Sequence, residues 1–171
     1  MSGFASTIEV ISQMGFGGKK ERGGTVIGYA SVEVQVEADF DRARRRAIFR
    51  RMAARLGRGC SRLLAFDEVR GGQLALNQLQ LGLRDVEVSK IVGSVARHDA
   101  FDRGFMPVKA SLAKRWKRVD RAFHSGIDLP PVRLHKIGDS YFVEDGNHRV
   151  SVARYHGVET IEADVTEFFP L

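Results

Sequence analysis

The stretch from Ser140 to Gly157 constrains the fold more than any other part of this sequence. The apolar run SYFV predicts a short strand, and the residues EDGNHR after it predict a tight turn at Gly146 that leads directly into a helix. Backbone N–H groups at the start of a helix have no partner within the helix and carry partial positive charge, so an anion can bind there. His148 and Arg149 add side-chain donors, and an arginine can bind a phosphate through two parallel hydrogen bonds. The stretch therefore predicts an anion site, with a structural asparagine cap and a solvated arginine as the alternative.

The residues on either side of this turn predict a mixed α/β domain over 84–171, preceded by an N-terminal region over 1–83. Alternating apolar residues indicate strands, and apolar residues three and four apart indicate helices. The expected elements of the domain are, in order, a strand and turn over 85–95, a polar turn over 95–105, a helix over 108–125, two strands around Gly138-Asp139, a helix after Asp145 and a closing strand over 160–169. In the helix over 108–125 we expect five residues to face inward: Leu112, Trp116, Val119, Ala122 and Phe123.

The N-terminal region is expected to hold a loop, a strand and a helix. Residues 15–24 are rich in glycine and charge, which is typical of a loop, and they lack the spacing of a nucleotide phosphate loop. Residues 25–40 alternate valines with polar residues and predict a half-buried strand. Asp39 then predicts the start of a helix that runs to about Leu56. Residues 61–82 read as helical or mixed.

The positive charge of the chain is concentrated in one segment. The net charge is +6, and residues 41–62 hold nine arginines against one aspartate. Such a helix attracts nucleic acid, anionic lipid or an acidic partner, whereas a solvated helix face usually interleaves glutamate with lysine. We expect DNA or RNA as the partner, with a solvated surface as the alternative. The candidate contacts are Arg42, Arg45, Arg46 and Arg50.

Composition favours a cytoplasmic protein without a membrane partner. The sequence contains no apolar run long enough to span a bilayer and no signal peptide, and its single cysteine, Cys60, excludes an internal disulfide. The five histidines include no pair four residues apart on one helix, and with a single cysteine we expect no structural zinc site. We assign no chemistry to His156. Trp116 lies among lysines and arginines and could stack on a base, but its helical spacing favours the core. Whether the chain forms a homodimer is left open.

Two segments of the C-terminal half resemble the ParB/sulfiredoxin superfamily, also called the ParB-like nuclease domain. The first is EVSKIVGSVARHDAFD, which resembles the family's strand and arginine-bearing turn, and the second is YFVEDGNHRVSVARYHGVETIEADV. ParB proteins have a strand, Gly-Glu-Arg-Arg, an alanine-rich helix, a glycine and a closing strand at this spacing. The matching positions are Gly146, His148, Arg149, Ala153, Gly157 and Val165.

The resemblance implies a site for nucleotide phosphate, because relatives bind CTP, ATP or ADP with the second segment. Bound Mg²⁺ is then expected too. The residues expected to bind the nucleotide are Gly146, Asn147, His148 and Arg149, with Arg97 and Ser94 from the first segment. Phosphoryl transfer requires a bound Mg²⁺ and a group that accepts the proton of the attacking hydroxyl. Asp145 and Glu144 are the candidates for catalysis, and Asp145 is also the candidate ligand of Mg²⁺. An Asx turn is the alternative role of Asp145.

The departures from the family narrow the expected function. Asn147 stands where sulfiredoxins have a cysteine, which excludes sulfinic acid repair, and His148 replaces the first ParB arginine. With no helix-turn-helix domain expected after Leu171, we do not expect a role in chromosome partitioning. The expected function is therefore nucleotide-phosphate binding, with NTP hydrolysis or phosphoryl transfer left open. DNA binding or nuclease activity without nucleotide turnover is the alternative.

Overall fold

The computed structural model describes residues 24–57, 61–71 and 76–170. The chain divides into two compact units, Met1–Ser31 and Val32–Leu171, and the second contains the sheet and the candidate site. The loop predicted over residues 15–24, apart from Gly24 at the start of the first helix, and Cys60 lie outside the described residues. The elements are α2 (Gly24–Leu56), β1 (Leu64–Ala65), α3 (Phe66–Arg70), β2 (Leu76–Glu87), η1 (Val88–Lys90), β3 (Ile91–Ser94), η2 (Ala110–Leu112), α4 (Ala113–His124), β4 (Val132–Ile137), β5 (Ser140–Asp145), α5 (Asn147–His156) and β6 (Thr160–Pro170).

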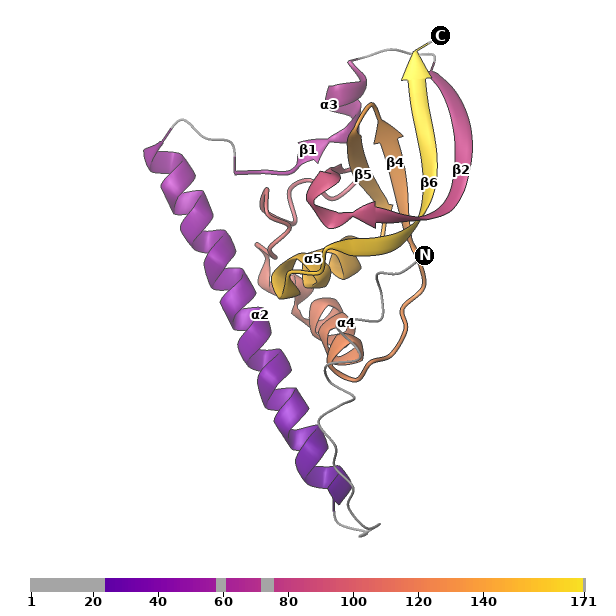
Figure 1. Ribbon diagram of the computed structural model, residues 1–171. Helices are drawn as coiled ribbons and strands as arrows, with labels where there is room; N and C mark the ends of the chain where they lie inside the picture. Colours follow the sequence, from indigo (N-terminus) through magenta and orange to yellow (C-terminus); the bar gives the residue numbers. More distant parts are fainter. Residues whose placement is uncertain (1–23, 58–60, 72–75, 171) are drawn as a thin grey trace. The chain divides into compact units, whose positions relative to one another are not determined.

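The strands form one mixed sheet in the order β1-β3-β5-β4-β6-β2 (Figure 1). β1 and β5 run parallel to β3, while β4 pairs antiparallel with β5 and parallel with β6. β5 therefore lies inside the sheet, and the turn that follows it opens beside buried strands on both sides. The mixed α/β fold expected from the sequence, a small mixed sheet with packed helices, is confirmed.

Two hydrophobic clusters position the turn between β5 and α5. One joins the inner face of the sheet to α5, where Val143 and Val150 are fully buried together with Leu134. The second joins α2, α4 and α5 around Trp116, which is fully buried and donates a hydrogen bond from Nε1 to Ser151 Oγ at 2.9 Å. The expectation that Trp116 belongs to the core is confirmed. Because α5 contributes to both clusters, its first turn is held firmly at the end of β5.

The strand predicted over residues 25–40 is wrong, because this segment belongs to α2. Val36 is fully buried whereas Val34 is 70% exposed, and the buried positions continue at helical spacing through Phe40 and Ala43. Alternating valines favour a strand locally, but packing against α4 and α5 buries one helical stripe instead. The intervening glutamates pair across to α4, Glu33 with Arg121 and Glu37 with Lys117.

The helix start predicted at Asp39 is also wrong, because α2 begins at Gly24 and passes through this residue, although it ends at Leu56 as expected. Residues 61–82, which read as helical or mixed, contain β1, α3 and the first half of β2 in their described part.

The Gly138-Asp139 turn, the helix after Asp145, the helix near 108–125 and the closing strand are confirmed. Phe123, which was expected to face inward, is 43% exposed. The expected boundary at residue 84 falls inside β2, which pairs with β6 along its length. Among the described residues, no helix is both long and apolar enough to cross a membrane.

Candidate functional site

Gly146 makes the turn between β5 and α5 possible. Its φ angle is +102°, in the left-handed region, and a Cβ atom placed on it would lie 2.6 Å from Val132 Cγ1. Both constraints favour glycine. α5 begins at the next residue, and no side chain caps its first turn. The first N–H groups of α5 therefore remain available to a bound anion, as expected from the sequence.

A cavity of about 290 Å³ opens at this helix start. Its lining contains both cationic and apolar residues. We call it the cationic pocket, and it is lined by Arg115, Arg118, Val119, Ala122, Leu129, Pro130, Gly146, His148 and Arg149. Among the described residues, neither Arg115 nor Arg118 forms an ion pair. Two arginine charges at the pocket are thus left uncompensated by carboxylates of the described residues.

Arg149 lines the pocket but is also tied to its surroundings. Its guanidinium donates hydrogen bonds to the carbonyl oxygens of Pro130 and Pro131, the second at 2.7 Å, and to Asp145 Oδ2 at 2.6 Å. Burial lowers the pKa of Arg149, against the opposing effect of Asp145. Arg149 therefore joins the segment before β4 to the turn, and it presents less of its guanidinium to a ligand than the sequence suggested.

The two acidic residues before Gly146 point in different directions. Asp145 is paired with Arg149, and 45% of its side chain is exposed. Glu144 is the neighbouring strand residue and lies near Arg133 and His135, at 3.6 and 3.8 Å, outside the lining of the cationic pocket. Adjacent strand residues face opposite sides of a sheet, so the structure does not bring these two carboxylates together.

Asn147 and His148 are both buried at the start of α5. Asn147 Oδ1 and His148 Nε2 have no hydrogen-bond partner among the described residues, although buried polar atoms usually have one. Burial and, to a smaller extent, the charges of Arg115, Arg97 and Arg118 together lower the pKa of His148 to about 4. The ring is therefore neutral near pH 7 and lies in a strongly positive field.

Ser94 and Arg97 have distinct positions. Ser94 is fully buried, donates a hydrogen bond to the Val143 carbonyl and accepts one from the Arg97 backbone N–H, both at 3.2 Å. Its hydroxyl thus holds the turn after β3 against β5. Arg97 is exposed and does not line the cationic pocket, but its charge reaches His148.

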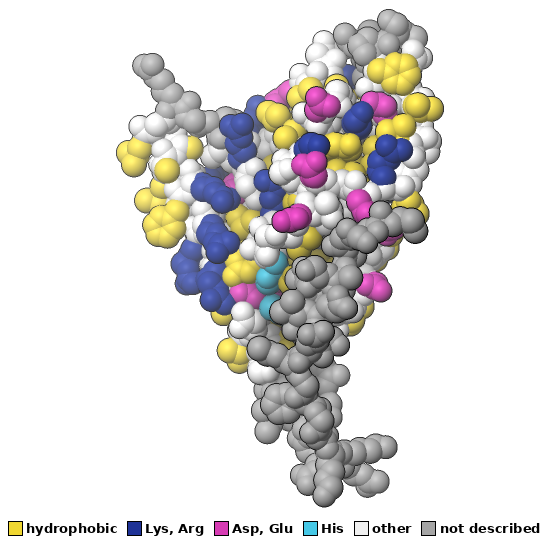
Figure 2. Space-filling model, in the orientation of Figure 1, with side chains coloured by type: hydrophobic (Ala, Val, Ile, Leu, Met, Phe, Trp, Pro, Cys, Tyr) yellow, Lys and Arg dark blue, Asp and Glu magenta, His cyan; other side chains and the backbone are white. Residues whose placement is uncertain are grey.

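The four arginines expected to bind nucleic acid differ in whether their side chains already contact other residues of the chain. Arg42 pairs with Asp39 at 2.8 Å, Arg50 pairs with the buried Asp102 at 3.3 Å, and Arg46 lies over the ring of Tyr155. Arg45 is exposed and makes no ion pair within the described part of the chain, and the same is true of Arg51 and Arg55. Figure 2 shows lysine and arginine side chains gathered along α2.

Sequence reasoning missed Arg115 and Arg118 as site residues. Both lie on α4, about 30 residues before the turn, and the spacing of three residues between them places them on one face of that helix. Nothing local indicates that this face meets the start of α5. The signal that was available is the unneutralised basic stretch AKRWKR, in which only the tryptophan is buried in full.

Comparison with known proteins gives one structural likeness. No protein-family model matches the chain, and no relative was found among curated proteins. Among solved structures, the crystal structure of sulfiredoxin from Arabidopsis thaliana is similar over 48% of this chain and 82% of its own, with 18% sequence identity and a TM-score of 0.33. At this TM-score the likeness carries no argument, so the function is argued from the site alone.

Proposed function

We propose that this chain binds the phosphate groups of a nucleoside di- or triphosphate (ATP, ADP or CTP) in the cationic pocket. The observation that carries the proposal is the convergence of Arg115 and Arg118, which no described carboxylate neutralises, on the uncapped start of α5. Helix N-termini and arginine side chains are the two groups that proteins most often use for phosphate. The unpartnered polar atoms of Asn147 and His148 add hydrogen-bonding capacity beside them.

The dimensions of the pocket favour a particular binding mode. Its volume of about 290 Å³ is at the lower end of ligand pockets, so it accommodates a phosphate chain more readily than a whole nucleotide. The apolar lining residues Val119, Leu129 and Pro130 support contact with the ribose or the base at the opening. Mg²⁺ would accompany the phosphates, with Asp145 contributing the oxygen that Arg149 does not occupy.

Binding without turnover is the form of the proposal that the geometry supports best. A general base would have to face the pocket, but Asp145 is paired with Arg149 and Glu144 lies beside His135. NTP hydrolysis and phosphoryl transfer therefore stay predictions from the family resemblance.

The test is a calorimetric titration with ATP, ADP, CTP, GTP and inorganic triphosphate, each with and without Mg²⁺. The double variant Arg115→Ala/Arg118→Ala should weaken binding by about tenfold or more per arginine, because each charge-assisted hydrogen bond contributes about 1.5–3 kcal/mol. Lys114→Ala is the matched control, since it removes an exposed cation from the same helix outside the pocket. Arg149→Ala is a poorer test because it also breaks the contacts to Pro130 and Pro131.

The measured affinities of the different ligands and variants distinguish between the possible outcomes. Inorganic triphosphate that binds as tightly as ATP would show that the base is not recognised. No binding by any nucleotide, or equal binding by the double variant, would contradict the proposal.

We propose, second, nucleic-acid binding through α2. The observation that favours it is a set of three arginines that form no ion pair with any described residue, Arg45, Arg51 and Arg55. Contacts to backbone phosphate release counterions, so affinity should fall steeply with salt. Replacing all three by alanine should reduce the slope of log K against log salt by up to about 3. The matched control is Lys90→Ala/Lys109→Ala/Lys114→Ala, which removes three exposed cations from other parts of the described chain. An affinity indifferent to salt would contradict the proposal.

A further inference from the structure

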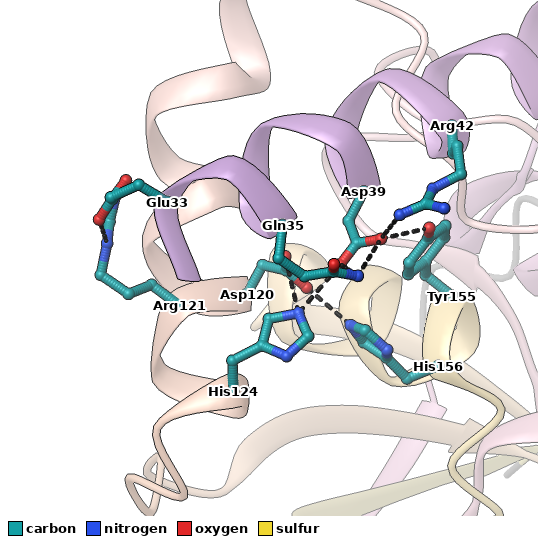
Figure 3. A network of polar contacts seen from close by, with 9 residues as sticks. All are labelled: Glu33, Gln35, Asp39, Arg42, Asp120, Arg121, His124, Tyr155 and His156. Carbon is teal, nitrogen blue, oxygen red and sulfur yellow. Dashed lines mark hydrogen bonds and ion pairs between the residues drawn. The ribbon is translucent and has the colours of Figure 1, made fainter. Parts of the chain in front are cut away.

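Four side chains from three helices meet away from the cationic pocket. Asp39 comes from α2, Asp120 and His124 come from α4, and His156 comes from the end of α5 (Figure 3). One carboxylate oxygen or ring nitrogen of each lies within 4.8 Å of the others. Figure 3 shows the four side chains pointing toward one another between the helices. We call this group the His/Asp cluster.

The His/Asp cluster is largely shielded from water. Asp120 is fully buried and Asp39 is 2% exposed, while the two histidines retain partial access at their edges. Asp120 Oδ1 accepts a hydrogen bond from His156 Nε2 at 2.7 Å, but Asp120 Oδ2 is buried and has no hydrogen-bond partner among the described residues. An unpartnered buried carboxylate oxygen is costly, and it indicates that something else binds there.

Several distances within the cluster are near those of a tetrahedral metal site. With metal–ligand bonds of 2.0–2.1 Å, ligand atoms in a tetrahedron lie about 3.3 Å apart. Asp120 approaches the two histidines with different oxygens: His156 Nε2 lies 2.7 Å from Asp120 Oδ1, and His124 Nε2 lies 3.6 Å from Asp120 Oδ2. His124 Nε2 also lies 2.9 Å from Asp39 Oδ2. One ligand atom of each residue lies within 4.8 Å of the others, so side-chain rotations that shorten the separations by up to about 1.5 Å would bring all four to one ion.

The surroundings of Asp39 orient it as a ligand. Asp39 Oδ1 accepts hydrogen bonds from Tyr155 Oη at 2.7 Å and from Arg42 at 2.8 Å. Burial raises the pKa of Asp39, but hydrogen bonds from Tyr155, His124 and Gln35 and the charge of Arg42 together hold that pKa below its ordinary value. Such outer partners are typical of metal ligands, because they fix the direction of the carboxylate.

We propose that the His/Asp cluster binds one divalent transition-metal ion, with Zn²⁺ as the best fit, through Asp39, Asp120, His124 and His156. Two imidazoles and two carboxylates suit Zn²⁺, whereas Mg²⁺ and Ca²⁺ prefer oxygen ligands alone. Two carboxylates also offset the charge of the ion.

All four positions of the tetrahedron come from the protein, so the site is closed. Closed zinc sites stabilise structure, whereas catalytic sites keep one position open for water or substrate. The ion would hold α2, which bears the arginines, against α4 and α5. Its role is therefore to fix α2 on the domain.

The first experiment measures Zn²⁺ binding to the untagged chain by competition with a chromogenic chelator. We expect one ion per chain, and Co²⁺ in its place should give the intense visible absorption of a tetrahedral site. Asp120→Asn and His124→Gln should weaken binding by more than about 100-fold, because even an outer-shell partner contributes 10- to 100-fold. Tyr155→Phe removes a hydrogen bond to the ligand Asp39 and should weaken Zn²⁺ binding by about 10- to 100-fold. The matched controls are Glu37→Gln on α2 and His135→Gln on β4, which lie outside the cluster.

The second experiment compares thermal unfolding with Zn²⁺, with Mg²⁺ and with a chelator. Zn²⁺ should raise the Tm of the wild type and of both controls, while Mg²⁺ should not. In chelator, Asp120→Asn should be at least as stable as the wild type, because it removes a buried carboxylate charge that lies close to the charge of Asp39. If the cluster is only a hydrogen-bond network, Zn²⁺ leaves the wild-type Tm unchanged and Asp120→Asn is destabilised. That result, or equal Zn²⁺ affinity in the cluster variants and the controls, would overturn the proposal.

Discussion

Gly146 combines a left-handed backbone with a close approach to Val132, and each feature separately disfavours a side chain. Gly138, in the turn between β4 and β5, has a left-handed φ of +56° but open space around it. The two glycines therefore allow backbone strain to be separated from steric overlap.

Gly146→Ala should lower the free energy of unfolding by about 1–3 kcal/mol from backbone strain, and further from the overlap with Val132. Gly138→Ala should show only the strain, at about 1 kcal/mol. Urea unfolding of both variants measures the difference. Equal losses would mean that the close approach to Val132 contributes nothing.

His148 makes stability depend on pH. Its pKa in the folded chain is about 4, below the ordinary value of 6.5, chiefly because of burial. Between these values the unfolded chain binds a proton that the folded chain does not, so stability falls as pH falls from 6.5 toward 4. The loss is at most about 3 kcal/mol.

Unfolding of the wild type and of His148→Gln at several pH values tests this prediction. The wild type should lose stability relative to the variant on acidification, because glutamine does not titrate. NMR titration of the His148 ring gives a second readout, and a nucleotide in the cationic pocket should raise its pKa toward 6.5, since phosphate offsets the field of the arginines. A stability difference that is constant with pH would contradict the assignment.

At the scale of elements, α2 carries arginines that pack against the rest of the domain and arginines that only add positive charge to its surface. Arg50 lies against Gly104 and gives the buried Asp102 its side-chain partner, whereas Arg45 is exposed and unpaired among the described residues. A variant that removes both therefore mixes a packing effect with a charge effect.

Arg50→Ala should lower the free energy of unfolding by about 1 kcal/mol, because Asp102 Oδ2 loses its cation while Oδ1 keeps the backbone N–H groups of Gly104 and Met106. Arg45→Ala should change it by less than about 0.5 kcal/mol. Chemical unfolding measures both. Equal effects of the two variants would show that the Arg50–Asp102 pair adds nothing to stability.

At the scale of the whole unit Val32–Leu171, the proposed zinc ion joins segments that are distant in the sequence. A local unfolding motion that separates α2 from α4 and α5 would break the zinc site and release the ion. At a Zn²⁺ concentration 100 times the Kd, hydrogen exchange of the backbone amides in these three helices should therefore slow by about 100-fold. Amides of β2 and β6 that exchange through local opening should be unaffected. Hydrogen exchange with mass spectrometry gives the answer, and Asp120→Asn is the variant that should show no slowing. Slowing in the sheet alone would contradict a site between the helices.

Features that depend on neighbours in the chain can be read from the sequence. The β4–β5 hairpin follows from Gly138-Asp139 between two apolar runs, and the turn at Gly146 follows from a glycine between a strand and a polar helix start. The amphipathic pattern of α4 likewise places Trp116 in the core. Local backbone preference and periodicity are sufficient for these elements, because the competing conformations lack a buried face.

Features that depend on distant partners were decided by the tertiary structure. Alternating valines over residues 25–40 predicted a strand, yet the packing of Phe40 and Ala43 in one cluster with residues of α4 and α5 selects a helix. Arg115 and Arg118 meet the start of α5 only because α4 packs beside it. The His/Asp cluster could not be predicted from the sequence for the same reason. Asp120 and His124 are four residues apart on α4, but the other two members come from α2 and α5. Pairing across space depends on how helices pack, and no periodicity within one segment encodes it.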